Sequence, residues 1–311
     1  MSKSESTWRP DGANGPLLSL YTTFRIGGPC RGLTTCETRA ELRRAVEALG
    51  EVGEEFVLLG GGSNLLVSDA GVNQQVIRYF SEKPQIARQG NELVVQAATR
   101  LDDLASYAVQ EGLDGLLCCT GIPGTVGGAI VGNAGAFGEQ IGDRVLSVIA
   151  MDHHANEREI PGDELAFGYR QSRLQNTDSI VVSVRLRLRL GDRDRLRTRR
   201  QEILALRAAK HPDWQHTPTA GSFFKNIEPT SKAERRQAAG WFLEQAGAKA
   251  LRVGKARPFE KHANIIVAER GCRAVDVLEL SRQMAALVKE KFGIELHREV
   301  RLLGSWPAGV A

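Results

Sequence analysis

Hydrophobic and polar positions change their spacing repeatedly along the chain, which predicts short strands interleaved with helices. In residues 180–190, valines and leucines alternate with a serine and three arginines, the pattern of a strand with one buried face. In residues 38–50, apolar positions recur at helical spacing behind a capping box formed by Thr38 and Glu41. We expect Gly50 to end this helix.

The same reasoning places the other elements. Further strands are predicted at 55–60, 64–69, 75–79, 91–99, 145–152, 264–270 and 296–304. Further helices are predicted at 101–112, 192–210, 231–247 and 274–291, the third behind a capping box of Ser231 and Glu234. Because these elements show no regular strand–helix–strand repeat, we expect an α+β fold rather than a doubly wound sheet.

Composition and charge narrow the class of protein. The 311 residues are 42% hydrophobic and 25% charged, as in an ordinary globular chain of two or three domains. A net charge of +4 gives no argument for nucleic acid, and the arginines of 185–210 are expected to form a solvated face. Residues 1–12 lack the apolar centre of a signal peptide, and no stretch is long enough to span a bilayer. We therefore expect a cytoplasmic protein that binds neither nucleic acid nor membrane.

The five cysteines are Cys30, Cys36, Cys118, Cys119 and Cys272, and no two of them form a CxxC pair. This odd number is typical of reduced thiols in a cytosol rather than of a disulfide framework or a zinc site, so we expect no metal. A redox role for Cys118 and Cys119 is disfavoured, because neighbours in sequence form only a strained bridge.

The distribution of glycine along the chain indicates a ligand-binding segment. Eight of the 33 glycines fall within residues 121–142. Each fixed glycine loses more conformational entropy than alanine would, so this cluster favours a backbone that lies against a flat or phosphorylated ligand. The run Gly60–Gly62 could cradle a pyrophosphate, but alone it is more typical of a tight connection between strands. Neither segment matches the dinucleotide fingerprint or the P-loop.

Eight motifs follow one another between residues 22 and 304. They are TTFRIGGP (22–29), LGGGSNLLVSD (59–69), GIPGTVGGAIVGNAGAFGE (121–139), FGYRQS (167–172), AGSFFKN (220–226), EQAGAKA (244–250), EKHANIIV (260–267) and REVRLLG (298–304). In this order they resemble the UDP-N-acetylenolpyruvoylglucosamine reductases, the MurB family of FAD-dependent enzymes. The resemblance covers nearly the whole chain.

The resemblance implies a two-subdomain FAD-binding fold of the vanillyl-alcohol-oxidase type, followed by a C-terminal α+β substrate domain. The expected divisions are an N-terminal tail at 1–20, FAD-binding subdomains at 21–88 and 89–200, and the substrate domain at 201–311. The FAD would be bound non-covalently. On the same grounds we expect a monomer, with NADPH as the co-substrate.

The reaction that the resemblance implies is reduction of UDP-N-acetylglucosamine enolpyruvate to UDP-N-acetylmuramate in peptidoglycan precursor synthesis. NADPH reduces the flavin and leaves, after which hydride passes from flavin N5 to the methylene C3 of the substrate. Arg170 matches the arginine that holds the carboxylate, because a guanidinium is always charged and contacts two oxygens at once. Glu299 matches the glutamate that assists the enolate, and we expect it to act protonated.

Ser222 matches the family's proton donor to C2. A hydroxyl is a weak acid, but a strongly basic carbon requires correct placement more than a lowered pKa. This role needs no neighbouring histidine, since Ser222 gives a proton and is not a nucleophile. Phe223 and Phe224 are expected to anchor the loop in the core.

Other site residues are carried over by their place in the motifs. The cofactor-binding set is Gly60, Gly61, Gly62, Ser63, Asn64, Gly121, Ile122, Pro123, Gly124, Gly127, Gly128, Asn133, Ala134 and Gly135. The substrate-binding set is Tyr169, Lys210, Asn226 and His262.

Several alternatives stay open. Without the resemblance, Arg170 reads as a surface ion pair and Glu299 as a strand-edge partner of a neighbouring arginine. His262 is nearly as well explained as a satisfied loop histidine. An alcohol or sugar oxidase of the same flavin superfamily is the second interpretation of the whole chain. It would need no Ser222 donor and would consume oxygen.

The sequence also departs from the family pattern. Arg170 and Ser222 are only 52 positions apart, which resembles the shorter type that lacks a tyrosine-bearing insertion. The other departures are Thr22, Ile227, Phe259 and Ala268. They bear on particular contacts rather than on the reaction.

Overall fold

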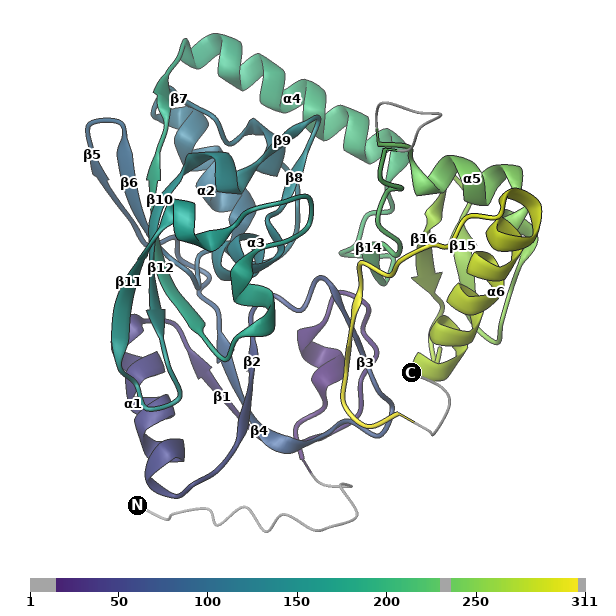
Figure 1. Ribbon diagram of the computed structural model, residues 1–311, viewed down its shortest axis with the longest axis horizontal. Coiled ribbons are helices and arrows are strands. Elements are labelled where there is room, and N and C mark those ends of the chain that lie inside the picture. The colour runs from purple at the N-terminus through teal and green to yellow at the C-terminus, as the bar shows by residue number, and fades with distance from the viewer. Residues whose placement is uncertain (1–14, 230–235, 307–311) are drawn as a thin grey trace. The chain divides into compact units, whose positions relative to one another are not determined.

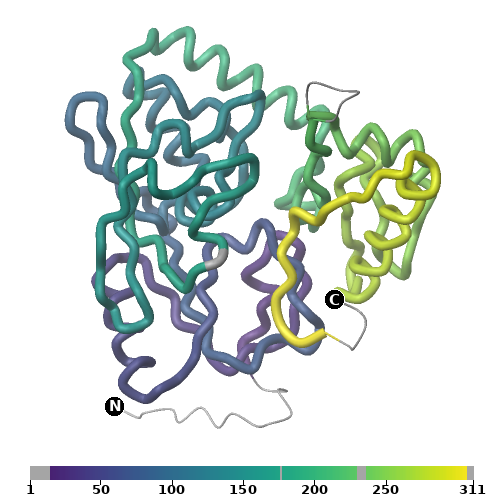
Figure 2. Tube along the Cα trace, in the orientation of Figure 1, coloured from purple at the N-terminus to yellow at the C-terminus, as the bar shows by residue number. Residues whose placement is uncertain are grey.

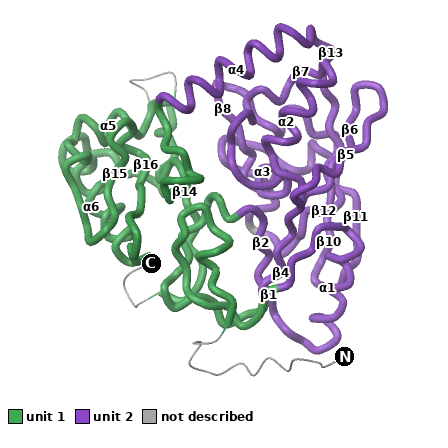
Figure 3. Tube along the Cα trace, turned by 180° about the vertical axis from the view of Figure 1, so that it is seen from behind, with its two compact units in different colours: residues 1–33, 62–75, 210–311 green, residues 34–61, 76–209 purple. Residues whose placement is uncertain are grey.

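The computed structural model describes residues 15–229 and 236–306, and its chain forms two compact units (Figures 1 and 3). Unit 1 takes residues 1–33, 62–75 and 210–311, and unit 2 takes residues 34–61 and 76–209. Mixed strands and helices in both units confirm the expected α+β class. The expected domain boundaries stay predictions.

The largest sheet of unit 2 has five antiparallel strands. Their spatial order is β11 (Glu157–Pro161), β10 (Val145–Met151), β12 (Ile180–Arg187), β6 (Glu92–Gln96) and β5 (Ile86–Gln89). The sequence pattern predicted β6, β10 and β12 but missed the two edge strands, whose residues are mostly polar.

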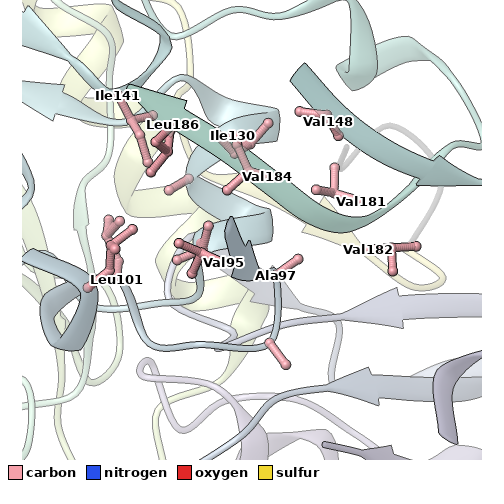
Figure 4. Close-up of a cluster of buried hydrophobic side chains, with 14 of the residues drawn as sticks. Val95, Ala97, Leu101, Ile130, Ile141, Val148, Val181, Val182, Val184 and Leu186 are labelled. Atoms are coloured by element: carbon pink, nitrogen blue, oxygen red, sulfur yellow. The ribbon is translucent and has the colours of Figure 1, made fainter. Parts of the chain in front are cut away.

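The central strand β12 shows the predicted alternation from Val184 to Arg187, whereas Ile180 to Ser183 are all buried. Val182, Val184 and Leu186 are buried, and in Figure 4 they lie in one cluster with Val95, Leu101, Ile130 and Ile141. The arginines of the opposite face are exposed, and Arg185 and Arg187 both bind Glu92. Ser183 on that face is buried, because it lies toward the middle of the sheet.

Four helices belong to unit 2 wholly or in large part: α1 (Arg39–Glu51), α2 (Leu101–Gln110), α3 (Val126–Gly132) and α4 (Arg193–Lys210). The capping box of Thr38 and Glu41 is present at the start of α1, as predicted. The prediction that Gly50 ends α1 is wrong. The helix continues through Glu51, and the positive φ of 66° that glycine tolerates occurs at Gly53 instead.

Smaller strand groups complete unit 2. A three-stranded sheet has the order β1 (Cys30–Cys36), β4 (Val72–Tyr79) and β2 (Phe56–Leu59), and the chains of β1 and β4 pass from one unit into the other. Two-stranded pairs join β7 (Leu113–Asp114) to β13 (Arg189–Leu190) and β8 (Gly135–Ala136) to β9 (Glu139–Gln140). Short 3₁₀ helices lie at Leu117–Cys119, Ile141–Arg144, Gly162–Leu165 and Arg173–Asn176.

Unit 1 contains an antiparallel sheet with the order β14 (Thr219–Ser222), β16 (His262–Ala268) and β15 (Ala256–Phe259). Helix α5 (Ala239–Gln245) packs on β16, and helix α6 (Ala274–Phe292) packs on α5 and β15. A parallel pair joins β3 (Leu65–Val67) to β17 (Arg301–Leu303). Short 3₁₀ helices lie at Leu18–Tyr21 and Ala248–Ala250.

The core of unit 1 combines three separate parts of the sequence, which the colours of Figure 2 distinguish. Phe24 and Leu66 come from the first 75 residues, and they are buried with Phe223, Phe242 and Val277 from the last hundred. Both Phe223 and Phe224 are buried and pack edge to face, as expected of loop anchors.

The helix predicted at 231–247 begins later than expected. Helix α5 starts at Ala239, because Gln237 exchanges two main-chain hydrogen bonds with Ile227 and is held in an extended bridge. The side chain of Asn226 then accepts a hydrogen bond from the N–H of Ala239. The proposed capping box of Ser231 and Glu234 lies outside the described residues. Among the residues described, no helix is long and apolar enough to cross a membrane.

Candidate active site

The glycine-rich segment of unit 2 forms α3 and the turns on either side of it. Its glycines differ in what a side chain would meet. A Cβ on Gly127 would come within 3.1 Å of the Cβ of Ala97, so this glycine is needed for packing within the chain. A Cβ on Gly128 would meet only Thr125 at 3.7 Å, and one on Gly132 would meet nothing within 4 Å.

Gly128 and Gly132 therefore leave a bare strip on α3 that the protein itself does not fill. Residues four apart lie on the same face of a helix, so the two glycines expose adjacent backbone. Neither has a positive φ, and no backbone conformation requires glycine there. A strip of this kind suits a ligand that must approach the main chain closely.

The Gly60–Gly62 run is shaped by contacts within the chain. A Cβ on Gly60 would lie 2.6 Å from the hydroxyl of Thr125, and one on Gly61 would lie 2.7 Å from the Cα of Gly124. In unit 1, Gly62 has a φ of 61° and leaves no space either, since a Cβ there would meet the carbonyl of Tyr21 at 2.1 Å. These glycines are explained by close packing, the alternative that the sequence favoured for this run alone.

Asn133 has a structural role in this segment. It is buried in the left-handed conformation at the end of α3, with a φ of 45°. Its amide donates to the carbonyl of Gly168 at 2.7 Å and accepts from the N–H of Gly142 at 3.0 Å. The bond from Asn133 to Gly168 also orders the loop that carries Arg170.

Arg170 is tied to the glycine-rich segment. Its guanidinium donates to the carbonyl of Gly135 at 2.9 Å, and its own carbonyl accepts from the side chain of Gln175. Its φ of 53° is unusual for a residue with a side chain, and such strain is found where the surroundings fix the conformation. The ring of Tyr169 lies 5.3 Å from the guanidinium carbon. Arg170 is thus positioned, rather than a mobile surface charge.

Arg207 on α4 is a second guanidinium at this place, and the sequence reasoning missed it. Its Cδ would lie 3.0 Å from a Cβ on Gly121. Burial lowers the pKa of Arg207, and the charge of nearby Arg170 lowers it further. Within the described residues its Nε atom is buried and has no hydrogen-bond partner. The only hint in the sequence is that Arg207 lies near the end of the predicted helix 192–210. The other arginines of that helix were expected to form a solvated face.

Asp102 holds the start of the segment in place. Its carboxylate accepts the N–H of Gly121 at 2.7 Å and binds Arg200 through two contacts of 2.8 and 2.9 Å. Burial opposes ionisation of this carboxyl, but the bonds from Arg200 and Gly121 outweigh it, so the pKa of Asp102 is lowered. The fixed negative charge leaves the conformation of Gly121 well defined.

Cys118 and Cys119 lie beside the same two arginines. Both thiols are buried and free, with 3.8 Å between the sulfur atoms. The hydrogen bond with Cys118 and burial raise the pKa of Cys119, and the charges of Arg207 and Arg170 act against this rise. All five cysteines are free thiols, so no disulfide contributes to the fold.

The residues of unit 2 fit a flat anionic cofactor such as FAD. The bare strip at Gly128 and Gly132 provides a surface that a side chain would otherwise cover. The Nε of Arg207 and the hydroxyl of Thr120, both buried and without a hydrogen-bond partner among residues 15–229 and 236–306, are polar atoms suited to such a ligand. Ile122, two residues after Thr120 in sequence, is half-buried. No group of three or more metal-ligating side chains occurs in the described part of the chain.

Ser222 is the last residue of β14 in unit 1 and pairs with Ile265 of β16. The preceding Gly221 has a φ of 76°, and a Cβ placed on it would meet no atom within 4 Å, so it leaves open space beside the serine. The following Phe223 is bonded through its N–H to the carbonyl of Asn264 at 2.7 Å. The hydroxyl is therefore carried on a rigid strand with access on one side.

Asn264 is a further positioning residue that the sequence reasoning missed. Its side chain accepts from the N–H of Phe224 at 2.9 Å and donates to the carbonyl of the same residue at 2.8 Å. The side chain is buried, so these bonds replace water that cannot reach the site. The signal available in the sequence was that Asn264 is a polar residue between Ala263 and the apolar residues 265–267 of the motif EKHANIIV.

Glu299 lies against the other side of the Ser222 segment. Its N–H donates to the carbonyl of Phe223 at 2.8 Å. Asn64 is bonded to the same segment. Its side chain donates to the carbonyl of Glu299 at 3.2 Å, and its main-chain carbonyl accepts from the N–H of Arg301. Unit 1 thus brings together Ser222, Glu299 and Asn64. The meeting of this group with Arg170 of unit 2 stays a prediction.

Three of the expected substrate contacts, Lys210, Asn226 and His262, belong to unit 1, whereas Tyr169 lies beside Arg170 in unit 2. His211 and His262 have ring centroids 5.5 Å apart. Burial lowers the pKa of His262, with smaller effects in the same direction from Lys249 and Lys210. A Cβ on Gly240 of α5 would come within 3.1 Å of the His262 ring, so the helix packs directly on the imidazole. Asn226 caps α5, as described above.

Comparisons with known proteins agree with this organisation. A family model described as an FAD binding domain matches residues 30–157, and one described as the C-terminal domain of UDP-N-acetylenolpyruvoylglucosamine reductase matches residues 212–303. The chain is 39% identical to a UDP-N-acetylenolpyruvoylglucosamine reductase of Heliobacterium modesticaldum, over 92% of this chain and 89% of that protein. It is 40% identical to the reductase 2 of Symbiobacterium thermophilum, over 93% and 91% of the two chains.

The solved structures include a close match in fold. The crystal structure of the reductase MurB from Thermus caldophilus aligns with a TM-score of 0.77 and 36% identity, covering 93% of this chain and 97% of that one. Family models, sequence relatives and structure agree over nearly the full length. The chain belongs to the UDP-N-acetylenolpyruvoylglucosamine reductase (MurB) family, as an α+β protein with an FAD-binding domain and the family's C-terminal domain.

Proposed function

We propose that this protein reduces UDP-N-acetylglucosamine enolpyruvate to UDP-N-acetylmuramate, with tightly but non-covalently bound FAD and with NADPH as the electron donor. The observation that carries the proposal is the placement of Ser222 at the end of β14, where the following residue, Phe223, is bonded to Asn264 on one side and to Glu299 on the other. The relatives' names supply the substrate class. The protein acts as a monomer in the cytoplasm in this proposal.

Bound FAD would supply the hydride for the methylene carbon of the enolpyruvyl group. The chain's own contribution begins with binding the substrate carboxylate. Arg170 suits this task, since its guanidinium is fixed by Gly135 and has the planar fork that matches a carboxylate. Negative charge that develops on the carboxylate and C2 is then stabilised by a donor that needs no rearrangement.

Ser222 completes the reaction by giving its hydroxyl proton to C2. The new C–H bond forms at the carbon, and the serine oxygen regains a proton from solvent. The space beside Gly221 allows a substrate to approach the hydroxyl. Glu299 in its protonated form donates a hydrogen bond to the enolate oxygen, because an ionised carboxylate would repel it.

Residues around β16 bind the remote part of the substrate. Lys210 provides a cation for the diphosphate, and His262 contacts the diphosphate or the uracil. Tyr169 and Asn226 contribute near the carboxylate and the sugar. Binding energy from these groups, distant from C2, fixes the reacting atoms in place and so contributes to the rate.

Gly128 and Gly132 leave room for FAD, and Arg207 faces its negative charge. The remaining cofactor contacts come from main-chain groups of Gly60 to Asn64 and of Gly121 to Gly124. Ile122 and Pro123 cover the ring system, while Gly127, Ala134 and Gly135 keep the segment in its conformation.

The decisive experiment measures NADPH oxidation by FAD-loaded protein with and without UDP-N-acetylglucosamine enolpyruvate, in the absence of oxygen. We expect continued oxidation, beyond the one NADPH that reduces each bound FAD, to require the enolpyruvyl substrate and to yield one product molecule for each further NADPH consumed. Oxidation that ignores this substrate, or oxygen uptake with an alcohol or sugar in place of NADPH, would contradict the proposal and favour the oxidase alternative.

A further inference from the structure

Unit 1 contains a cavity of about 600 Å³ that the proposed reaction does not use. Its walls come from the loop around Arg25, the turn at His216–Pro218 and the segment that follows β16. All of these parts belong to unit 1. The volume lies in the range that holds a small metabolite.

Cationic side chains dominate the polar lining of this cavity. Arg25, Arg257 and Arg270 line it together with His216, whereas Glu269 is the one carboxylate among the lining residues. Glu269 is already engaged by Arg252 at 2.8 Å and by Arg257 at 3.4 Å. Arg257 also binds Glu260 and His216 binds Asp213, so the positive charge available to an anion comes from Arg25 and Arg270, which pair with no carboxylate in the described part of the chain.

The floor of the cavity is apolar. Phe24, Ile26 and Val267 line it but are almost completely buried, so the apolar surface that a ligand can contact is provided by the half-buried Pro218 and Cys272. A surface of this kind favours a ring or another apolar body next to the anionic group. The combination of an apolar floor with a few charged groups is common in sites for small molecules.

Arg25 is held in a strained conformation at the edge of the cavity. Its φ of 53° lies in the left-handed region that side chains rarely adopt. Its guanidinium donates to the carbonyl of Gln215, which ties the loop of Arg25 to the turn that carries His216. Strain of this kind is concentrated at binding sites.

We propose that this cavity binds a phosphorylated small molecule that carries a ring, of about the size of a nucleoside monophosphate. The guanidinium groups of Arg25 and Arg270 contact the phosphate, since each can donate two hydrogen bonds to one anion. The ring lies against Pro218 and Cys272.

The site is separate from the proposed substrate contacts of unit 1. Ser222 pairs with Ile265, and His262 begins β16, whereas the cavity is lined from Val267 onward, at the far end of that strand. It is nevertheless joined to the Ser222 strand. Thr23, next to the cavity residue Phe24, exchanges two hydrogen bonds with Thr219, the first residue of β14.

Cys272 provides a local reporter of occupancy. It lines the cavity and is half-buried, whereas the other four thiols are buried. Burial raises the pKa of Cys272 to about 12, so alkylation is slow and is best followed in mildly alkaline buffer. The experiment measures the rate at which iodoacetamide modifies Cys272 in the FAD-loaded protein, by mass spectrometry of its peptide.

Adenosine monophosphate, adenosine and inorganic phosphate are the three probes, compared at equal ionic strength. We expect adenosine monophosphate to slow the alkylation of Cys272 at lower concentration than either of the others. Equal protection by adenosine would overturn the role of the anion, and equal protection by phosphate would overturn the role of the apolar floor. No protection by any probe would refute the site.

Variants separate this cavity from other nucleotide sites in the protein. Arg270→Glu should weaken protection by adenosine monophosphate by about tenfold or more, as expected for loss of one charge-assisted contact. Lys289→Glu makes the same charge change on the exposed face of α6 and should leave protection unchanged. Arg25→Asn tests the second contact, since asparagine tolerates a positive φ. Protection that survives both arginine variants would overturn the proposal.

Discussion

The main-chain N–H of Glu299 donates a 2.8 Å hydrogen bond to the carbonyl of Phe223, the residue that follows Ser222. This bond places two candidate catalytic residues, 77 positions apart in sequence, on adjacent extended segments. The position of Ser222 is therefore set by backbone geometry on both sides, and its chemistry can be tested by changing the hydroxyl alone.

Removing that hydroxyl should separate the two halves of the reaction. With Ser222→Ala we expect NADPH to reduce the enzyme at the normal rate, while oxidation of the reduced enzyme by the enolpyruvyl substrate slows about 10² to 10⁴-fold, as for loss of a general acid. Anaerobic stopped-flow absorbance measures both steps in one sample. If both steps keep their normal rates, Ser222 is not the proton donor.

The bare strip on α3 gives a prediction with opposite signs for stability and for cofactor binding. Gly128→Ala and Gly132→Ala should raise the stability of the FAD-free protein by about 0.5 to 1 kcal/mol each, because alanine restricts the unfolded chain and meets no close contact. The added methyl groups should weaken FAD binding.

Gly127→Ala is the matched control, because its methyl group would press on Ala97. We expect it to destabilise the FAD-free protein. Thermal unfolding without FAD and fluorescence titration with FAD provide the two measurements. Unaltered FAD affinity in both strip variants would show that the cofactor does not lie on this strip.

Arg207 should stabilise the loaded protein and destabilise the empty one. Burial and the charge of Arg170 lower its pKa, so the charged form is unfavourable until an anion binds. Replacement by a methionine of similar length should raise the unfolding temperature of the FAD-free protein and reduce FAD affinity. Arg207→Lys should not restore that affinity, since it lacks the planar fork.

Thermal unfolding of these two variants with and without FAD measures both effects. A lower unfolding temperature for the FAD-free Arg207→Met protein would mean that this guanidinium serves the fold instead.

His262 should make stability depend on pH in acid. Burial lowers its pKa below the ordinary 6.5, so the unfolded chain takes up a proton more readily than the folded one. Stability should be unaffected by this group above pH 6.5 and should be lost as the pH falls from there toward the lower pKa of the folded state. Urea unfolding at a series of pH values should show that His262→Gln loses this part of the slope. If the stability of His262→Gln depended on pH with the same slope as that of the unchanged protein, this prediction would be contradicted.

Much of the fold was predictable where local pattern and environment agree. The strand of Val182 and Val184 and the helix capped by Thr38 have strong periodicity. Both formed, although the helix ends one residue later and the strand three residues earlier than expected. The start of α5 was not predictable in this way, since the pairing of Gln237 with Ile227 is a tertiary contact that overrides helix propensity.

The residues of the candidate site also differ in how well the sequence predicts them. Motifs with a chemical signature, such as Ser222 after a glycine, could be found from sequence, because the residue type itself limits the role. Asn264 and Arg207 could not be found in this way. The first acts only through the main chain of Phe224, and the second is defined by its proximity to Gly121, which lies 86 positions earlier.

The three-segment core of unit 1 has a consequence for the order of events during protein synthesis. Phe24 and Leu66 leave the ribosome early, but their partners Phe223, Phe242 and Val277 are translated last. Unit 2 has all of its residues once position 209 has emerged, so it can fold while its companion is still being made. Until then, Phe24 and Leu66 stay exposed in the nascent chain. Aggregation or chaperone binding therefore competes with their burial.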